Sequence, residues 1–136
     1  MRSAALLLAL LAGAAQADTI GLHVGSWHSR PGYNNVNPGA FYRADDGLTV
    51  GAYCNSQSRS PNNPDAPTCR PSAYAGVTWG GDGLVALTAG VVTGYTYGPL
   101  PIVLPSIKLG PVRVGVLPKV EPMGAWVVHA MLEMKL

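Results

Sequence analysis

The sequence predicts an all-β fold, an eight-stranded antiparallel up-and-down transmembrane β-barrel. Many segments alternate with period two, and none keeps a helical period. Tight turns alternate with longer connections, which is the pattern of bacterial outer-membrane barrels. Charged residues make up 12% of the chain, whereas soluble proteins carry about a quarter. These three observations together favour a barrel embedded in the outer membrane.

The first 17 residues read as a secretory signal peptide. Arg2 supplies the charge, residues 4–11 form the apolar core, and Ala15-Gln16-Ala17 is the small-residue cleavage site. The apolar core is too short for a transmembrane helix. We therefore expect export, with residues 18–136 forming one barrel domain.

Eight strands are expected in the exported chain. Their predicted ranges are 19–28, 38–43, 47–54, 71–79, 84–96, 101–109, 111–117 and 125–136. Tight turns at 43–47, 80–83 and 110–111 are rich in Gly, Asp and Pro. The remaining connections, 29–37, 55–70, 97–100 and 118–124, are mostly longer. An even strand count places both termini at the periplasmic end.

The faces of the predicted strands indicate what the barrel holds. In the fifth strand one face is apolar with tyrosines, whereas the other is small and apolar, with Ala86, Thr88, Gly90 and Val92. The first face suits lipid, and the second suits a slot for an alkyl chain. Eight strands leave room for one small ligand, so we do not expect a general diffusion channel.

Prolines interrupt the sixth predicted strand, Pro99-Leu100-Pro101-Ile102-Val103-Leu104-Pro105. Proline has no N–H to donate to a β-ladder, so each one leaves a missing hydrogen bond. In a membrane barrel such a break opens sideways towards lipid. The sixth strand therefore predicts a lateral entry for a lipid.

The chain has two cysteines, Cys54 and Cys69. In an oxidising compartment an even pair usually forms a disulfide. A loop of this length gains about 3 kcal/mol in the chain-entropy model. We expect a structural bridge with no redox role.

Several segments share their residue types and order with one family. Trp27-His28-Ser29-Arg30 is similar to a Trp-His-Ala-Arg motif, and Tyr33-Asn34-Asn35 before Pro38-Gly39 is similar to a Tyr-Asn-Glu segment before a glycine-rich strand. Leu87-Thr88-Ala89-Gly90-Val91, the proline-rich run and Gly110-Pro111-Val112 match most closely. The chain thus resembles the PagP-type lipid A palmitoyltransferases, outer-membrane barrels, over nearly its whole exported length.

The resemblance implies an acyltransferase that moves a fatty acyl chain from a phospholipid donor to lipid A of lipopolysaccharide. It implies a membrane-embedded enzyme without a cofactor. His28 falls on the family's essential histidine and Ser56 on its serine, whereas Asn55 stands where the family has aspartate. Thr78 stands at the glycine that sets acyl-chain length, so a shorter slot is implied. Pro101 and Pro105 would flank the lipid entry.

The residues themselves support the same chemistry. The predicted topology brings His28, Asn55 and Ser56 to one rim, where a base and a hydroxyl can serve acyl transfer. A neutral amide can orient an imidazole but cannot stabilise its cation by charge. His23 and His129 are interpreted as inward-facing, hydrogen-bonded residues, with His23 on the same face as Trp27. No metal-ligand spacing or phosphate-binding loop is present, and the formal net charge of +2 favours no nucleic acid.

Two other functions stay open. A non-enzymatic barrel, structural or lipid-binding, is favoured by Asn55 in place of aspartate. A lipid A deacylase is suggested because His28-Ser29 before Asn34-Asn35 resembles the His-x-Ser-Asn region of those hydrolases. We expect a monomer in all cases.

Overall fold

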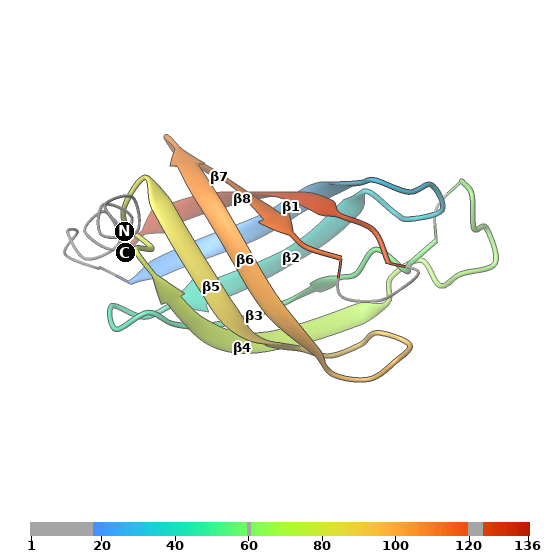
Figure 1. Cartoon of the computed structure of the whole chain (residues 1–136), viewed down its shortest axis with the longest axis horizontal. Helices are drawn as coiled ribbons and strands as arrows, with labels where there is room; N and C mark the ends of the chain where they lie inside the picture. Colours follow the sequence, from blue (N-terminus) through green and yellow to red (C-terminus); the bar gives the residue numbers. More distant parts are fainter. Residues whose placement is uncertain (1–17, 60, 120–123) are drawn as a thin grey trace, which may run out of the picture.

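A computed structural model of the chain describes residues 18–59, 61–119 and 124–136, and the predicted signal peptide lies outside these ranges. Eight antiparallel strands close into a barrel in which each strand pairs with the next and β8 pairs with β1 (Figure 1). The strands are β1 (Thr19–His28), β2 (Val36–Arg43), β3 (Leu48–Cys54), β4 (Pro71–Trp79), β5 (Val85–Val92), β6 (Leu100–Leu109), β7 (Val112–Leu117) and β8 (Val127–Lys135). The predicted eight-stranded up-and-down barrel is confirmed. The described residues include no helix that is long and apolar enough to cross a bilayer.

The barrel has two different ends, which we call the terminal end and the loop end. At the terminal end β1 begins, β8 ends and the connections between strands are tight (left in Figure 1). At the loop end lie the longer connections, including the segment between β3 and β4 (right in Figure 1). Short turns at one end and longer loops at the other agree with the predicted topology.

The fifth strand is shorter than predicted. It ends at Val92, because Gly94 has a φ of 92°, a left-handed conformation that turns the chain out of the strand. Tyr95 therefore does not continue the outward face. Its hydroxyl instead lies 2.9 Å from the hydroxyl of Tyr53, which lines the barrel interior. The expected extension to residue 96 is wrong for this reason.

A bulge changes the face of β1 near the loop end. The register shifts between His23 and Gly25 on both sides: β1 has one extra residue relative to β8, and β2 has one extra residue relative to β1. His23 points inward as expected, but Trp27 lies on the outer surface with 59% of its area exposed. The same shift turns Ser26 and His28 towards the interior, where both line the cavity.

The interior is more polar than the small apolar face of β5 suggested. Ala86 and Val92 are buried as expected. However, four other strands contribute large polar side chains to the interior cavity, namely His23, Tyr53, Tyr74 and His129. The small apolar face was predicted from the fifth strand alone, whereas neighbouring strands place other residues inside, among them the inward-facing His23 and His129 that the sequence predicted.

Paired charges close the terminal end of the barrel. Glu133 on β8 accepts hydrogen bonds from Arg43 (2.9 Å) and Arg113 (2.8 Å), and Lys108 lies 3.3 Å from its second oxygen. Both guanidinium groups also donate to the carbonyl of Gly81. These residues form an ionic floor beneath the cavity, so the cavity communicates with solvent at the loop end.

Candidate active site

The loop-side end of β1 places His28 in the wall of the cavity. Its Nδ1 lies 3.0 Å from Oδ1 of Asn35 in the connection after β1, and its ring stacks on Tyr33 at 4.7 Å between centroids. An amide oxygen can only accept a hydrogen bond, so Nδ1 carries a proton, and in the neutral imidazole Nε2 keeps its lone pair. Among the described residues Nε2 has no hydrogen-bond partner. In its neutral form His28 thus presents Nε2 at the cavity as an acceptor to which no described residue donates.

Ser56 follows β3 and lines the same cavity as His28. Its backbone carbonyl accepts the N–H of Asn34 at 2.8 Å, which ties the β3–β4 connection to the β1–β2 connection. Within the described part of the chain the Ser56 hydroxyl has no hydrogen-bond partner, His28 included. The structure therefore brings the two predicted residues to one cavity without joining them directly.

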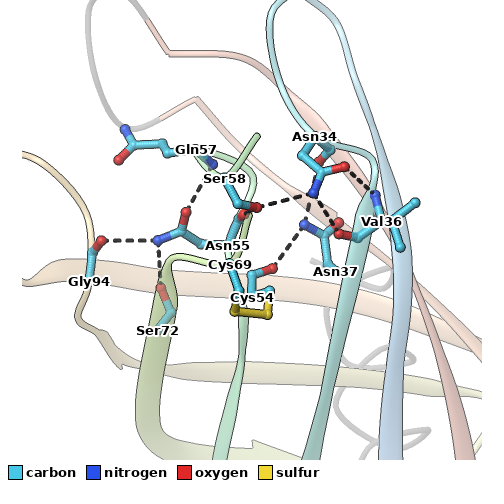
Figure 2. The surroundings of a disulfide bond; sticks show 10 residues. All are labelled: Asn34, Val36, Asn37, Cys54, Asn55, Gln57, Ser58, Cys69, Ser72 and Gly94. Carbon is cyan, nitrogen blue, oxygen red and sulfur yellow. Dashed lines mark hydrogen bonds between the residues drawn. A yellow bond between two sulfur atoms is a disulfide. The ribbon is translucent and has the colours of Figure 1, made fainter. Parts of the chain in front are cut away.

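Asn55 has a different place from the one that the resemblance implied. Its side chain is fully buried and donates to Ser72 Oγ (3.1 Å) and to the Gly94 carbonyl (3.0 Å), as Figure 2 shows. Its Oδ1 accepts the N–H of Gln57 at 2.9 Å. All of these contacts hold the connection after β3 in place. The amide that contacts His28 is Asn35, which the sequence analysis did not single out for this role.

A scaffold of amides and hydroxyls surrounds this rim, and Figure 2 shows its contacts. Asn34 donates to Ser58 Oγ at 3.1 Å, and Ser58 Oγ donates to the Asn55 carbonyl at 2.6 Å. Asn37, which is buried, donates to the Cys54 carbonyl at 3.1 Å. The predicted disulfide between Cys54 and Cys69 is confirmed. The β1–β2 and β3–β4 connections are therefore fixed against each other at the loop end.

The cavity below this rim has two chemically distinct walls. One wall is apolar and comes from β5 to β8, with Val92, Leu100, Ile102, Leu104, Leu117, Val127 and Met131. The other wall carries imidazole and phenol groups from β1, β3, β4 and β8. An alkyl chain can pack along the first wall while hydrogen-bonding groups remain available on the second.

The wall of the barrel is incomplete between β6 and β7. The β6–β7 ladder covers Ser106 to Leu109 only, and Leu100 to Pro105 pair with β5 alone among the described residues. The N–H of Lys108 donates to the Leu84 carbonyl, so the backbone N–H groups of the even-numbered residues of β6 point towards β5. The backbone nitrogens of the odd-numbered residues, Pro101 and Pro105 among them, therefore point towards β7. The two prolines thus lack an N–H on the side of β6 that faces β7, where β6 forms no ladder among the described residues.

The cavity extends to this edge. Five consecutive residues of β6, from Leu100 to Leu104, line it, although successive residues of a strand point to opposite faces. Pro101 is among them. Pro105 lies next to the last paired residue of the ladder, Ser106. The cavity therefore meets the outer surface of the barrel through the β6–β7 gap.

Thr78 lies deeper, below the cavity lining. It is buried, and its hydroxyl lies 2.8 Å from those of both Thr49 and Thr88. Thr49 and Thr88 line the cavity. The three hydroxyls form a polar band across β3, β4 and β5, so a chain that reaches this depth meets hydroxyls.

No protein-family model matches this sequence, and no curated protein matches it either. Within residues 18–59, 61–119 and 124–136, no three His, Cys, Asp or Glu side chains are grouped so as to hold a metal ion.

Proposed function

We propose that this chain is an outer-membrane barrel, because its outer surface is suited to lipid. Large apolar side chains are exposed on every strand, and we call them the apolar belt: Ile20, Leu22, Val24, Val36, Leu48, Val50, Val77, Val91, Val103, Ile107, Leu109, Val116, Val128, Leu132 and Met134. A soluble protein rarely exposes a contiguous apolar surface of this extent. Aromatic residues flank the belt, with Trp27, Tyr97 and Trp126 at the loop end and Tyr42 and Trp79 at the terminal end. Such aromatic residues are typical of membrane interfaces.

We further propose that the barrel transfers a fatty acyl chain from a phospholipid to lipid A, as the resemblance to the PagP-type family implies. The observation that carries this proposal is His28, a neutral imidazole with a free Nε2 in the wall of a cavity that also opens sideways. A lipid in the outer leaflet can insert an acyl chain through the β6–β7 gap without leaving the membrane. Its ester group then lies at the rim beside His28 and Ser56.

The reaction is a transesterification. His28 Nε2 takes the proton of the lipid A hydroxyl while that oxygen attacks the ester carbonyl carbon of the phospholipid. The resulting oxyanion accepts a hydrogen bond from the Ser56 hydroxyl, which has no partner among the described residues. Collapse breaks the bond to the glycerol oxygen, which receives the proton from His28. Asn35 holds the imidazole in the required tautomer throughout.

Mass spectrometry of lipid A tests this function. Lipid A from cells that express the chain is compared with lipid A from cells that carry an empty vector. We expect a new species that is heavier by one fatty acyl group, and its mass identifies the chain. Heat-modifiable gel mobility shows separately that the barrel has folded. An unchanged profile with a folded barrel would exclude the transferase.

A lipid-binding barrel without catalysis is the second candidate. It is favoured by the absence of a hydrogen bond between His28 and Ser56 in the described part of the chain, and by the use of Asn55 as a structural amide. The deacylase is less well supported, because the Ser29 hydroxyl already accepts the N–H of Trp126 at 2.9 Å. Loss of one acyl group from lipid A would favour the deacylase, and an unchanged profile the non-enzymatic barrel.

A further inference from the structure

A hydrogen-bonded group of three polar residues crosses the middle of the barrel, and we call it the histidine layer. His23 Nδ1 lies 2.8 Å from His129 Nε2, and His23 Nε2 lies 3.0 Å from the Tyr74 hydroxyl. Both imidazoles are 7% exposed, and all three residues line the cavity. The proposed acyl transfer assigns these residues no role.

One ring nitrogen of the histidine layer, His129 Nδ1, has no hydrogen-bond partner among the described residues, whichever tautomer is present. When His23 Nδ1 carries the shared proton, His129 must carry its own proton on Nδ1, which is then a free donor. When His129 Nε2 carries the shared proton, Nδ1 is a free acceptor. In the described structure His129 Nδ1 has no hydrogen-bond partner in either case. Because His129 lines the cavity, this atom is open to a ligand that can hydrogen-bond to it, and an acyl chain that displaces water from the cavity without such a group leaves it unpaired.

The histidine layer lies close below the reactive rim. On β8, Val127 pairs with His28 and His129 pairs with Ser26, so His129 lies two residues further into the barrel. Two residues of a strand span about 7 Å. An acyl chain whose carbonyl lies at His28 therefore passes the histidine layer near its carbonyl end, and its remaining length packs on the apolar wall.

We propose that the cavity selects a fatty acyl chain with a hydroxyl near its carbonyl, as in a 3-hydroxyacyl chain, and that His129 Nδ1 binds that hydroxyl. A hydroxyl can donate or accept, so it satisfies His129 in either tautomer. A site built to hydrogen-bond a hydroxyl rejects an analogue without one, because its own polar group is then left unpaired. This inference rests on the proposed function in so far as the cavity holds an acyl chain.

Binding of matched fatty acids to the refolded chain in detergent tests the proposal. The probes are dodecanoic acid, 3-hydroxydodecanoic acid and 12-hydroxydodecanoic acid, and the dissociation constants are measured by calorimetric titration. We expect the 3-hydroxy acid to bind about 3- to 10-fold more tightly than the other two, the ratio for one net hydrogen bond. Equal affinities, or a preference for the 12-hydroxy isomer, would overturn the proposal without requiring any variant.

Two variants then identify the atom responsible. His129→Phe keeps a ring but removes Nδ1, so the preference for the 3-hydroxy acid should disappear. Tyr53→Phe is the matched control, because it removes a cavity hydroxyl that is bonded to Tyr95 and lies outside the histidine layer. It should retain the preference. A preference that survives in His129→Phe would contradict the assignment to His129.

The fatty acid affinities test this inference separately from the lipid A profile, which tests the proposed transferase. A heavier lipid A species together with equal fatty acid affinities would overturn this inference alone. A clear preference for the 3-hydroxy acid with unchanged lipid A would instead support a barrel that binds hydroxyacyl chains without transferring them.

Discussion

The two ends of the barrel are stabilised by different kinds of polar contact. At the terminal end, the Glu133 carboxylate is shared by Arg43, Arg113 and Lys108, and Asp82 lies 3.0 Å from Lys135. At the loop end, the contacts around His28 are made by neutral amides and hydroxyls, and a disulfide closes the single connection between β3 and β4. Charge closes one end, whereas neutral hydrogen bonds shape the other.

This difference separates stability from chemistry. A buried carboxylate with several cationic partners leaves its guanidinium groups uncompensated when it is removed. Neutral amides can hold loops in place and still leave single atoms free, and His28 Nε2 and the Ser56 hydroxyl have no hydrogen-bond partner in residues 18–59, 61–119 and 124–136. We therefore expect substitutions at the terminal end to change folding and substitutions at the rim to change rate.

The largest effect on rate is expected for His28→Ala. Removing the base should lower acyl transfer from phospholipid to lipid A by about 10²- to 10⁴-fold, the usual contribution of a positioned general base. The measurement is the rate of label transfer in detergent, with heat-modifiable mobility as the check on folding. Undiminished transfer by a folded His28→Ala barrel would remove this residue from the mechanism.

The largest effect on stability is expected for Glu133→Gln. This change removes the carboxylate that Arg43 and Arg113 share, and leaves Arg43 only the weaker ion pair with Asp82 at 3.9 Å, which should lower the free energy of unfolding by about 3–5 kcal/mol. Urea unfolding of the barrel in vesicles, followed by tryptophan fluorescence, measures the difference. Asp45→Asn, in an exposed turn at the same end, is the control and should change stability by less than about 0.5 kcal/mol. Equal effects of the two changes would show that the ionic floor is not a major source of stability.

The disulfide offers a smaller change in stability at the opposite end. The cysteines are 15 residues apart, so replacing both (Cys54→Ser with Cys69→Ser) should cost about 3 kcal/mol in the chain-entropy model. The same urea assay measures this loss, and reduction of the native chain is a second route to it. A stability unchanged by either treatment would mean that the amide scaffold alone fixes these loops.

The strands could be predicted because alternation directly reports which face a residue occupies. Thr19–His28 and Pro71–Trp79 have the predicted bounds. β5 was overextended because period two continues through Tyr95, whereas the left-handed Gly94 ends the strand. Alternation also could not reveal the bulge after His23, so Trp27 was assigned to the wrong face. A single inserted residue reverses every side chain beyond it.

The site was only partly predictable for a similar reason. His28 and Ser56 could be brought to one rim by counting strands, because strand ends depend on topology. The partner of His28 depends on loop conformation, and three asparagines follow it within ten residues, Asn34, Asn35 and Asn37. One signal could have favoured Asn35: it directly precedes the second strand, so the connection brings it back beside the end of the first strand. The sequence alone, however, does not decide which of the three amides faces the imidazole.

The last prediction compares two asparagines that the resemblance and the structure place differently. Asn35→Ala removes the amide that sets the tautomer of His28 and should lower the transfer rate by about 10- to 100-fold, with little change in stability. Asn55→Ala should do the reverse, costing about 1–3 kcal/mol of stability because Ser72 and Gly94 lose a buried donor.

Both variants are measured by transfer rate per folded barrel and by urea unfolding. The two assays together are decisive, because an orienting amide and a structural amide differ in which quantity they change. If Asn55→Ala lowers the rate of the folded barrel and Asn35→Ala does not, the orienting role returns to Asn55. The loop end would then have to rearrange during catalysis, since Asn55 now directs its amide towards β4 and away from His28.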